Sequence, residues 1–211
     1  MTTLPSGCIQ QRDKETYAIR TTPTSGMVTP DDLETVARVA RKYNIPQIKI
    51  TTGQRLALIG LKEEDVPQVC AELPFPIAGH YVQACLGNRW CKLGVQNSLA
   101  MATAIEKRYA SIPVLAKIKM GVSGCPTCCA ESYVRDIGLI GTRNGWTLVV
   151  GGNSASRARI ADVLATDLST EEALDLIDRF LTFYNENGKK KQRVSRFVNE
   201  KGIDAIKEAL L

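Results

Sequence analysis

The sequence predicts an α+β protein, in which a region of mixed strands and helices is followed by a helical C-terminus. In the first part, short runs of β-forming residues alternate with amphipathic segments. In the middle part, two β-rich runs surround Arg143-Asn144-Gly145, which is typical of a hairpin. In the last part, apolar residues recur at helical spacing. We therefore expect three parts, over residues 1–76, 77–168 and 169–211.

Local signals define the elements of the first part. Residues 15–21, ETYAIRT, have the composition of a strand. A helix is expected to begin at Pro30, with Thr29 as its N-cap, and to end before Pro46. Two strands joined through Gly53 and one short helix complete this part, over 46–52, 54–61 and 63–73.

The middle part is expected to begin near Gly79, with a strand over 80–84 that leads into Cys85. A helix over 95–109 and a strand over 113–123 precede the hairpin. The rest is expected to be helical, over 156–165, then over 170–188 with Ser169 or Thr170 as the cap, then in two short terminal helices.

Composition restricts the class of protein. The chain has 211 residues, 44% of them hydrophobic, which is enough for a core in one or two small domains. Its apolar runs fall short of the roughly 20 residues of a membrane span, and residues 1–13 lack the layout of a signal peptide. We therefore expect a cytoplasmic protein without membrane contact.

A net charge of +5 with only 6% aromatic residues and no RNA-binding motif disfavours nucleic acid, and suits a small polyanion or an acidic protein.

Cysteines give the strongest chemical signal. In a reducing compartment, clustered cysteines indicate a metal centre or redox chemistry more than disulfides. Two pairs lie where predicted strands end in loops, Cys85-x5-Cys91 and Cys125-x3-Cys129. Four thiolates can complete the iron sites of a cubane cluster. Zinc is the alternative, because Cys125-x2-Cys128 has zinc-ribbon spacing, although the x5 pair fits zinc poorly.

Several segments resemble the sulfite and nitrite reductases that contain siroheme and a 4Fe–4S cluster. ACLGNRWCKLGVQNSLAMATAIEKR (84–108) resembles the first cluster segment of that family, and SGCPTCCAESYVRDIGLIG (123–141) resembles the second. GGNSASRARIADVLA (151–165) is similar to its Gly-Gly-Asn stretch. LPSGCIQQRDKETYAIRT (4–21) and KITTGQRLALIG (49–60) are similar to the opening domain of small assimilatory-type members. The resemblance implies a ferredoxin-like N-terminal half-domain, then a mixed α/β domain for siroheme and the cluster, then C-terminal helices.

The resemblance also implies the ligands of the cluster. By position, Cys85, Cys91, Cys125 and Cys129 would bind it, and Cys129 would be the thiolate shared with the siroheme iron. Two residues of the second motif depart from the family. Thr127 replaces the usual Asn, and Cys128 takes a position that is usually held by a small residue. We expect Cys128 to be a packed side chain, with a role as a rival ligand as the alternative.

A Lys-x-Lys pair is the predicted substrate site. Lys117 and Lys119 lie two apart on a predicted strand, so their side chains share one face. By resemblance they match the lysines that precede the cluster loop and contact the oxyanion. On a strand without that resemblance, such a pair would be read as a solvated face. Cations at this place would hold the anion and supply or relay protons.

Other basic residues are predicted to bind substrate or siroheme. Arg55 lies near the position of a substrate arginine in relatives, offset by two from Gly53. Guanidinium groups suit carboxylates because they pair with them bidentately. The residues expected to hold the siroheme carboxylates are Arg20, Arg89, Asn153, Arg157 and Arg159. His80, the one histidine, is expected in a strand and not as an iron ligand.

The predicted function is the six-electron reduction of sulfite to sulfide, in a reduced or anaerobic cytoplasm. Nitrite reduction to ammonia is the first alternative, and a non-catalytic siroheme and iron–sulfur electron-transfer protein is the second. A zinc-stabilised nucleic-acid-binding module is a third reading. No flavin or nicotinamide motif is visible, so electrons should arrive from an external carrier such as a ferredoxin. Because the chain resembles one half of larger relatives, we also expect a homodimer. The alternative is that the C-terminal helices after Ser169 fold back and close the pocket within one chain.

Overall fold

The computed structural model describes residues 4–5, 7–77, 81–109 and 112–211. The predictions for Gly79 and His80 therefore fall outside the described residues. The chain forms two compact units, residues 1–81 and 82–211, and each is described by itself. The predicted three-part division at 76 and 168 stays a prediction.

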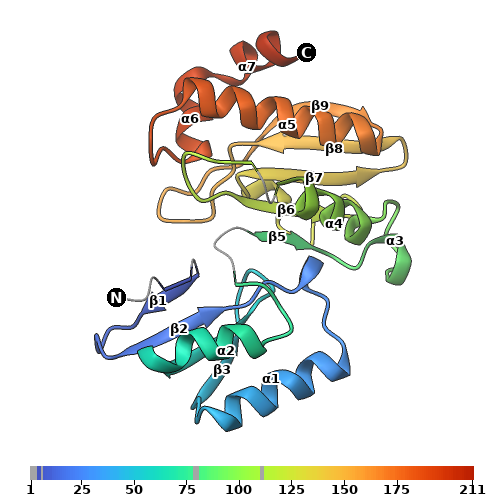
Figure 1. Ribbon diagram of the computed structural model, residues 1–211. Helices are drawn as coiled ribbons and strands as arrows, with labels where there is room; N and C mark the ends of the chain where they lie inside the picture. Colours follow the sequence, from blue (N-terminus) through green and yellow to red (C-terminus); the bar gives the residue numbers. More distant parts are fainter. Residues whose placement is uncertain (1–3, 6, 78–80, 110–111) are drawn as a thin grey trace. The chain divides into compact units, whose positions relative to one another are not determined.

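The first unit is an antiparallel four-stranded sheet with the order β1-β2-β4-β3 (Figure 1). Its core lies between the sheet and two helices, and includes Ile19, Val39 and Leu58. Its elements are β1 (Cys8–Gln10), β2 (Thr16–Arg20), η1 (Thr24–Gly26), α1 (Pro30–Lys42), β3 (Gln47–Ile50), β4 (Leu56–Lys62), η2 (Glu63–Asp65) and α2 (Val66–Glu72).

Helix α1 begins as the sequence predicts. The Thr29 side chain accepts a hydrogen bond from Asp32 N, and the Asp32 carboxylate accepts one from Thr29 N, so the two residues form a capping box. Pro30 occupies the first helical position, where a missing N–H costs nothing. Strand β1, only three residues long, was not predicted.

The second unit is a five-stranded sheet with the order β5-β6-β7-β8-β9, covered by helices. β6 and β7 run parallel, whereas β7, β8 and β9 are antiparallel. Its elements are β5 (Tyr81–Ala84), α3 (Gly87–Trp90), α4 (Ser98–Tyr109), β6 (Lys119–Ser123), η3 (Ser132–Val134), β7 (Ile137–Thr142), β8 (Gly145–Val150), β9 (Asp162–Leu168), α5 (Thr170–Asn187), α6 (Val194–Lys201) and α7 (Ile203–Leu210).

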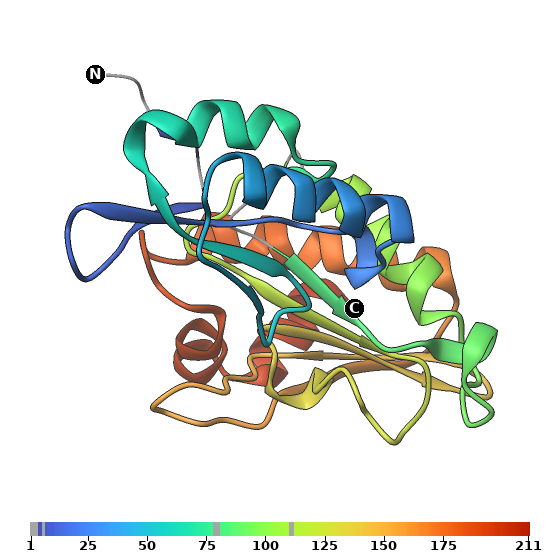
Figure 2. The ribbon, with the colours of Figure 1, turned by 90° about the horizontal axis from the view of Figure 1, so that it is seen from below.

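Helices and loops cover opposite faces of this second sheet. Met101 of α4 and Phe180 of α5 pack in one core with Met120 of β6 and Leu148 of β8. Figure 2 shows these two helices on one side of the sheet and irregular loops on the other. The loop side has a small apolar cluster of its own, Ile140, Val149 and Ala161. None of the described helices is long and apolar enough to cross a membrane.

The predicted helix over 156–165 is wrong. Asn153 and Arg159 form an antiparallel bridge, and Asp162–Leu168 is strand β9. Val163 pairs with Val149 of β8, and Leu164 is buried in the core. The segment is a strand because its backbone hydrogen bonds are made with β8, a partner that a periodic pattern within the segment does not reveal.

Two further elements differ from prediction. The strand expected over 113–123 is shorter, since β6 begins at Lys119 and leaves Lys117 in the preceding loop. The four-residue helix α3 between the first two motif cysteines was not predicted. The hairpin formed by β7 and β8, and helix α5 with Ser169 as its cap, are confirmed.

Candidate cofactor and substrate site

Strand β6 connects Lys119, the second residue of the predicted lysine pair, to the second cysteine motif. Lys117 lies before the strand, so the expectation that both lysines share one strand face does not hold. The alternation of β6 places Met120 and Val122 in the helix-covered core. Lys119, Gly121 and Ser123 lie on the opposite face, and this face carries the candidate site. The sheet thus provides one rigid element from which both the lysine and the cysteine loop project.

Two glycines let the loop after β6 fold back against this face. A Cβ on Gly121 would lie 2.7 Å from Ala130 O, and one on Gly138 of β7 would lie 2.2 Å from Ser132 O. Both contacts are with backbone, which cannot move aside cheaply. Residues 124–134 therefore pack against the sheet because these two positions carry no side chain.

Two buried serines fix the same loop. Ser132 Oγ donates to Leu139 O at 2.9 Å and lies 2.9 Å from Ser123 Oγ, which accepts a hydrogen bond from Ala130 N at 3.1 Å. Both serines are fully buried. Buried hydroxyls with satisfied hydrogen bonds hold a loop in one conformation. Sequence reasoning missed both serines, since nothing local marks them as buried.

The two cysteine loops lie against each other. Gly124 N donates to Cys85 Sγ at 3.1 Å, and Gly124 O accepts hydrogen bonds from Val95 N at 2.8 Å and Gln96 N at 3.0 Å. A Cβ on Gly124 would lie 2.7 Å from Gly87 Cα, so the two backbones are in direct contact. The structure therefore brings together the segments that contain the two predicted ligand pairs.

The four predicted ligands differ in exposure. Cys125 is buried, Cys85 and Cys91 are half-buried, Cys129 is exposed, and all are free thiols. In the part of the chain that the structure describes, no three Cys, His, Asp or Glu side chains converge closely enough to hold a metal. The donor set nevertheless fits an iron–sulfur cluster, because four thiols lie on two adjoining loops. One of them, Cys85, already accepts a hydrogen bond from a backbone N–H, as cluster sulfurs do. Binding would require these side chains to turn toward one another.

Cys128 and Cys129 have different surroundings. Cys128 packs against the apolar cluster of Ile140, Val149 and Ala161, in a left-handed backbone conformation with φ of 59°. Cys129 is exposed. This placement agrees with the prediction that Cys128 is a packed side chain.

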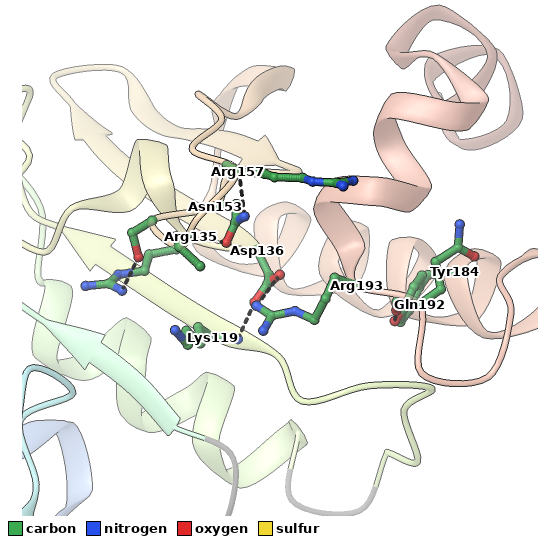
Figure 3. A network of polar contacts seen from close by, with 10 residues as sticks. Lys119, Arg135, Asp136, Asn153, Arg157, Tyr184, Gln192 and Arg193 are labelled. Atoms are coloured by element: carbon green, nitrogen blue, oxygen red, sulfur yellow. Dashed lines mark hydrogen bonds and ion pairs between the residues drawn. The ribbon is translucent and has the colours of Figure 1, made fainter.

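Lys119 lies beside a buried carboxylate, as Figure 3 shows. Lys119 N donates to Asp136 Oδ2 at 2.8 Å, and Arg193 Nη2 donates to both Asp136 oxygens at 2.9 and 2.6 Å. Asp136 is 1% exposed, and burial raises the pKa of its carboxyl although Arg193 acts in the opposite direction. Burial, followed by the charges of Arg193 and Arg135, lowers the pKa of the Lys119 ammonium.

Asp136, Arg135 and Arg193 are site residues that sequence reasoning missed. Arg135 is 4% exposed, donates to Gln83 Oε1 at 2.8 Å, and forms an ion pair with Glu131. A charged dipeptide directly before the apolar run of β7 was the available signal, because a charge next to a core strand needs a partner. Arg193 had no comparable signal.

The predicted siroheme residues of the 151–161 loop have separate tasks. Asn153 Nδ2 donates to Arg157 O at 2.7 Å and so closes the turn. Arg159 forms an ion pair with Asp162 at 2.5 Å and donates to Gly151 O at 3.0 Å, so it holds the loop to β9. Arg157 is exposed. Of the two arginines, Arg157 is therefore the one whose guanidinium is not already used by the fold.

Three other predicted arginines lie on other elements of the chain. Arg55 is 3% exposed in the first unit, with its guanidinium 4.6 Å from the centroid of the Tyr81 ring. Arg20 ends strand β2 of the same unit. Arg89 lies on α3, between two motif cysteines, with its guanidinium 5.4 Å from the Trp90 ring centroid. Their roles in binding stay predictions.

The chain matches two described protein families over nearly its whole length. Residues 80–211 match the nitrite and sulphite reductase 4Fe-4S domain, and residues 9–74 match the nitrite/sulfite reductase ferredoxin-like half domain. The chain therefore belongs to the nitrite and sulphite reductase family, oxidoreductases that carry siroheme and a 4Fe–4S cluster. The matches confirm the predicted ferredoxin-like fold of the first part and the predicted cofactor pair.

Among individual relatives, the chain is 53% identical to the assimilatory-type sulfite reductase of Nitratidesulfovibrio vulgaris (strain Hildenborough), over 98% of both chains. It is 36% identical to the NAD(P)H nitrite reductase of Bacillus subtilis (strain 168), over 92% of this chain but only 25% of that one. The nitrite reductase (NADH) large subunit of Escherichia coli (strain K12) is also 36% identical, over 93% of this chain and 24% of its own length.

Solved structures share the fold at low identity. Dissimilatory sulfite reductase I superposes with a TM-score of 0.83 at 13% identity, over 92% of this chain and 68% of that chain. The NirA protein of Mycobacterium tuberculosis gives 0.80 at 20% identity, over 98% and 42%. These likenesses support the α+β architecture.

Proposed function

We propose that this protein reduces sulfite to sulfide at a siroheme coupled to a 4Fe–4S cluster. The observation that carries the proposal is the 53% identity, over 98% of both chains, to an assimilatory-type sulfite reductase. The balanced reaction consumes one sulfite, six electrons and seven protons, and yields one hydrosulfide and three water molecules. The active site must therefore bind an anion and deliver many protons.

The chain's own residues supply the binding groups. Cys85, Cys91, Cys125 and Cys129 would hold the cluster, and Cys129, which is exposed, would also be the thiolate shared with siroheme. When bound, the two cofactors would relay electrons from the donor, and the siroheme would supply an iron for the anion. Of Arg157 and Arg159, Arg157 is the candidate for a siroheme carboxylate, because Arg159 is already used by Asp162.

Lys119 and Lys117 would hold the oxyanion and pass protons to it. A proton donor works best when its pKa lies near the operating pH. Burial and two neighbouring guanidiniums lower the pKa of Lys119, which moves this ammonium in the required direction. Lys117, in the loop just before β6, would add a second cation to the same site.

Nitrite is the second candidate substrate, because nitrite reductases match more than nine-tenths of this chain. We further propose that electrons come from a separate carrier such as a ferredoxin, in a reduced cytoplasm. We also propose that Arg55 takes part in binding substrate and that Arg20 takes part in binding siroheme.

A homodimer would complete a site that larger relatives build from two halves. Light scattering on the holoprotein tests this last point, and a mass near 23 kDa with full activity would refute the dimer.

The test of the main proposal is a direct assay. Protein purified without oxygen should show the visible bands of siroheme, and should contain iron and acid-labile sulfide in cluster amounts. With a reduced viologen as electron donor it should convert sulfite to sulfide, with a higher kcat/KM for sulfite than for nitrite. Full cofactor content without turnover of either anion would favour a pure electron carrier and overturn the proposal.

A further inference from the structure

The carboxylate of Asp136 receives hydrogen bonds from two distant parts of the chain. One comes from Lys119 N at the start of β6, 17 residues before it, and two come from Arg193, 57 residues after it. Because the Asp136 side chain is buried while that of Arg193 is 38% exposed, this ion pair is screened less by water than a surface pair would be. The link joins the C-terminal segment to the strand that carries the predicted catalytic lysine.

Arg193 is itself held firmly in place. It is the residue directly before α6, and its carbonyl accepts hydrogen bonds from Arg196 N and Phe197 N, both at 3.0 Å. The neighbouring Gln192 receives the hydroxyl hydrogen bond of Tyr184 and donates to Glu200 at 2.9 Å. These contacts fix the backbone at Arg193, and the guanidinium itself is held by its two hydrogen bonds to Asp136.

The charges around Lys119 form an uneven set. Arg193, Arg135 and Asp136 are the charged groups whose electrostatic effects shift the pKa of its ammonium. Tyr109 and Tyr184 are the other titratable groups near Asp136, and the pKa of each is raised, that of Tyr184 to about 12, so both are neutral at physiological pH. Among the described residues, the Lys119 ammonium has no ion pair, since Arg193 occupies both oxygens of Asp136. Lys119 therefore has two positively charged neighbours, Arg193 and Arg135, and one negatively charged neighbour, Asp136, which is already bound by Arg193.

We propose that Arg193 is a positioning residue of the reductase. By binding both oxygens of Asp136, it fixes the start of β6 and keeps Asp136 from pairing with the Lys119 ammonium, which stays available to an oxyanion. The inference rests on the proposed function, in which Lys119 delivers protons to the substrate. If Arg193 were absent, Asp136 would turn to Lys119 as its nearest cation, and Lys119 would become a weaker acid and a worse ligand.

The test compares Arg193→Gln with Arg196→Gln in the holoprotein. Arg196 lies on the same C-terminal segment and pairs with Glu200, away from Asp136, so it controls for loss of charge there. The first measurement is the pH dependence of acetylation of Lys119 by trace acetic anhydride, read by peptide mass spectrometry with exposed Lys190 as the internal reference. The second is sulfite turnover against pH, with siroheme and cluster spectra as a check on assembly.

In Arg193→Gln the acetylation midpoint of Lys119 should move to higher pH, because a repelling charge is lost and Asp136 is released. We expect kcat at neutral pH to fall about 10-fold, with KM changed less than about threefold. The pH at which the rate declines on the alkaline side should become higher. Arg196→Gln should match the wild type in every respect. A Lys119 titration in Arg193→Gln identical to that in Arg196→Gln would overturn the proposal, and so would an identical kcat.

A second pair of variants keeps the test decisive. If Arg193→Gln does not assemble its cofactors, Arg193→Lys replaces it, since lysine keeps the charge but lacks the planar two-oxygen fork. A partial loss of kcat with intact spectra would support the proposal, and unchanged kcat and titration would refute it. Lys119→Ala separates the two hypotheses. Wild-type turnover there would refute the proton role of Lys119, whereas an unshifted Lys119 titration in Arg193→Gln refutes the role of Arg193 whatever the turnover.

Discussion

At the carboxyl end of β6, the loop of Cys125 and Cys129 is held by neutral contacts. At the amino end, Lys119 N is held by the buried carboxylate of Asp136, which forms an ion pair with Arg193. The cysteine loop depends on two serine hydroxyls and on glycines that allow backbone to touch backbone. The lysine end depends on Asp136 and on a guanidinium from the C-terminal segment. The two ends of the same strand are therefore held by different kinds of interaction, neutral at one end and charged at the other.

The difference has a chemical reason. A cluster loop must keep its shape while electrons pass, and neutral hydrogen bonds do not change with pH or salt in the range where proteins work. A proton donor must change its charge during turnover, so its surroundings have to be electrostatic. We therefore expect variants at the cysteine end to affect cofactor content and stability, and variants at the lysine end to affect rate and pH dependence.

The largest effect is expected where the cysteine end meets the cofactors. Cys129→Ser should uncouple or lose the siroheme and abolish sulfite turnover, because it removes the exposed thiol that we propose as the bridge to the siroheme iron. Cys128→Ser should keep both cofactors and most of the activity, since this side chain packs against Ile140 and Val149. Visible spectra, iron and sulfide content, and turnover decide. A cluster lost from Cys128→Ser but kept in Cys129→Ser would reverse the ligand assignment.

At the lysine end, Lys119→Ala and Lys117→Ala should each lower sulfite turnover by about 10²-fold, the scale expected when a positioned acid or cation is removed. Siroheme and cluster spectra should be unchanged, because no cofactor ligand is touched. Lys190→Ala, an exposed lysine, is the control for loss of charge. Normal steady-state kinetics in both active-site variants would remove the lysine pair from the site.

Gly138→Ala tests the neutral packing of the cysteine end. The new methyl would lie 2.2 Å from Ser132 O, so either β7 or the loop must move. Such overpacking costs about 1–3 kcal/mol in the free energy of unfolding. We expect a lower Tm and weaker retention of the cluster, measured by thermal unfolding and by iron release. Wild-type values for both would mean that the loop has more room than its contacts indicate.

Features that depend on residues close together in the sequence are predicted well. The capping boxes at Thr29 and Ser169, and the turn around Asn144-Gly145, involve residues three or fewer apart, so a single sequence contains their whole signal. The two paired cysteine motifs were equally visible, and the structure places the loops that carry them in direct contact.

The remainder depends on partners far along the chain. The segment over 156–165 was expected to be helical, because its apolar spacing does not reveal that β8 supplies its hydrogen bonds. The Asp136–Arg193 pair joins positions 57 residues apart, and only the folded chain brings them together. The lysine pair was recognised, but the network around Lys119 that would tune its acidity was not.

The smallest expected effect concerns stability at the lysine end. The pKa of Lys119 is lowered in the folded protein, chiefly by burial and then by Arg193 and Arg135, with Asp136 acting in the opposite direction. Between this lowered pKa and the usual lysine value of about 10.4, the unfolded chain holds more protons than the folded one, so stability rises with pH. Below the lowered pKa, the cost of keeping Lys119 charged is fully present.

Lys119→Met, which keeps an unbranched side chain only one atom shorter and removes the charge, should relieve that cost. At neutral pH its Tm should exceed that of the wild type by no more than a few degrees. The difference should shrink as pH rises through the folded-state pKa of Lys119, because the wild type then loses the same charge. Titration of Asp136, Tyr109 and Tyr184 is common to both proteins and largely cancels. Thermal unfolding at several pH values, with Lys190→Met as the exposed control, measures this. A difference that stays constant with pH would show that packing, not charge, separates the two proteins.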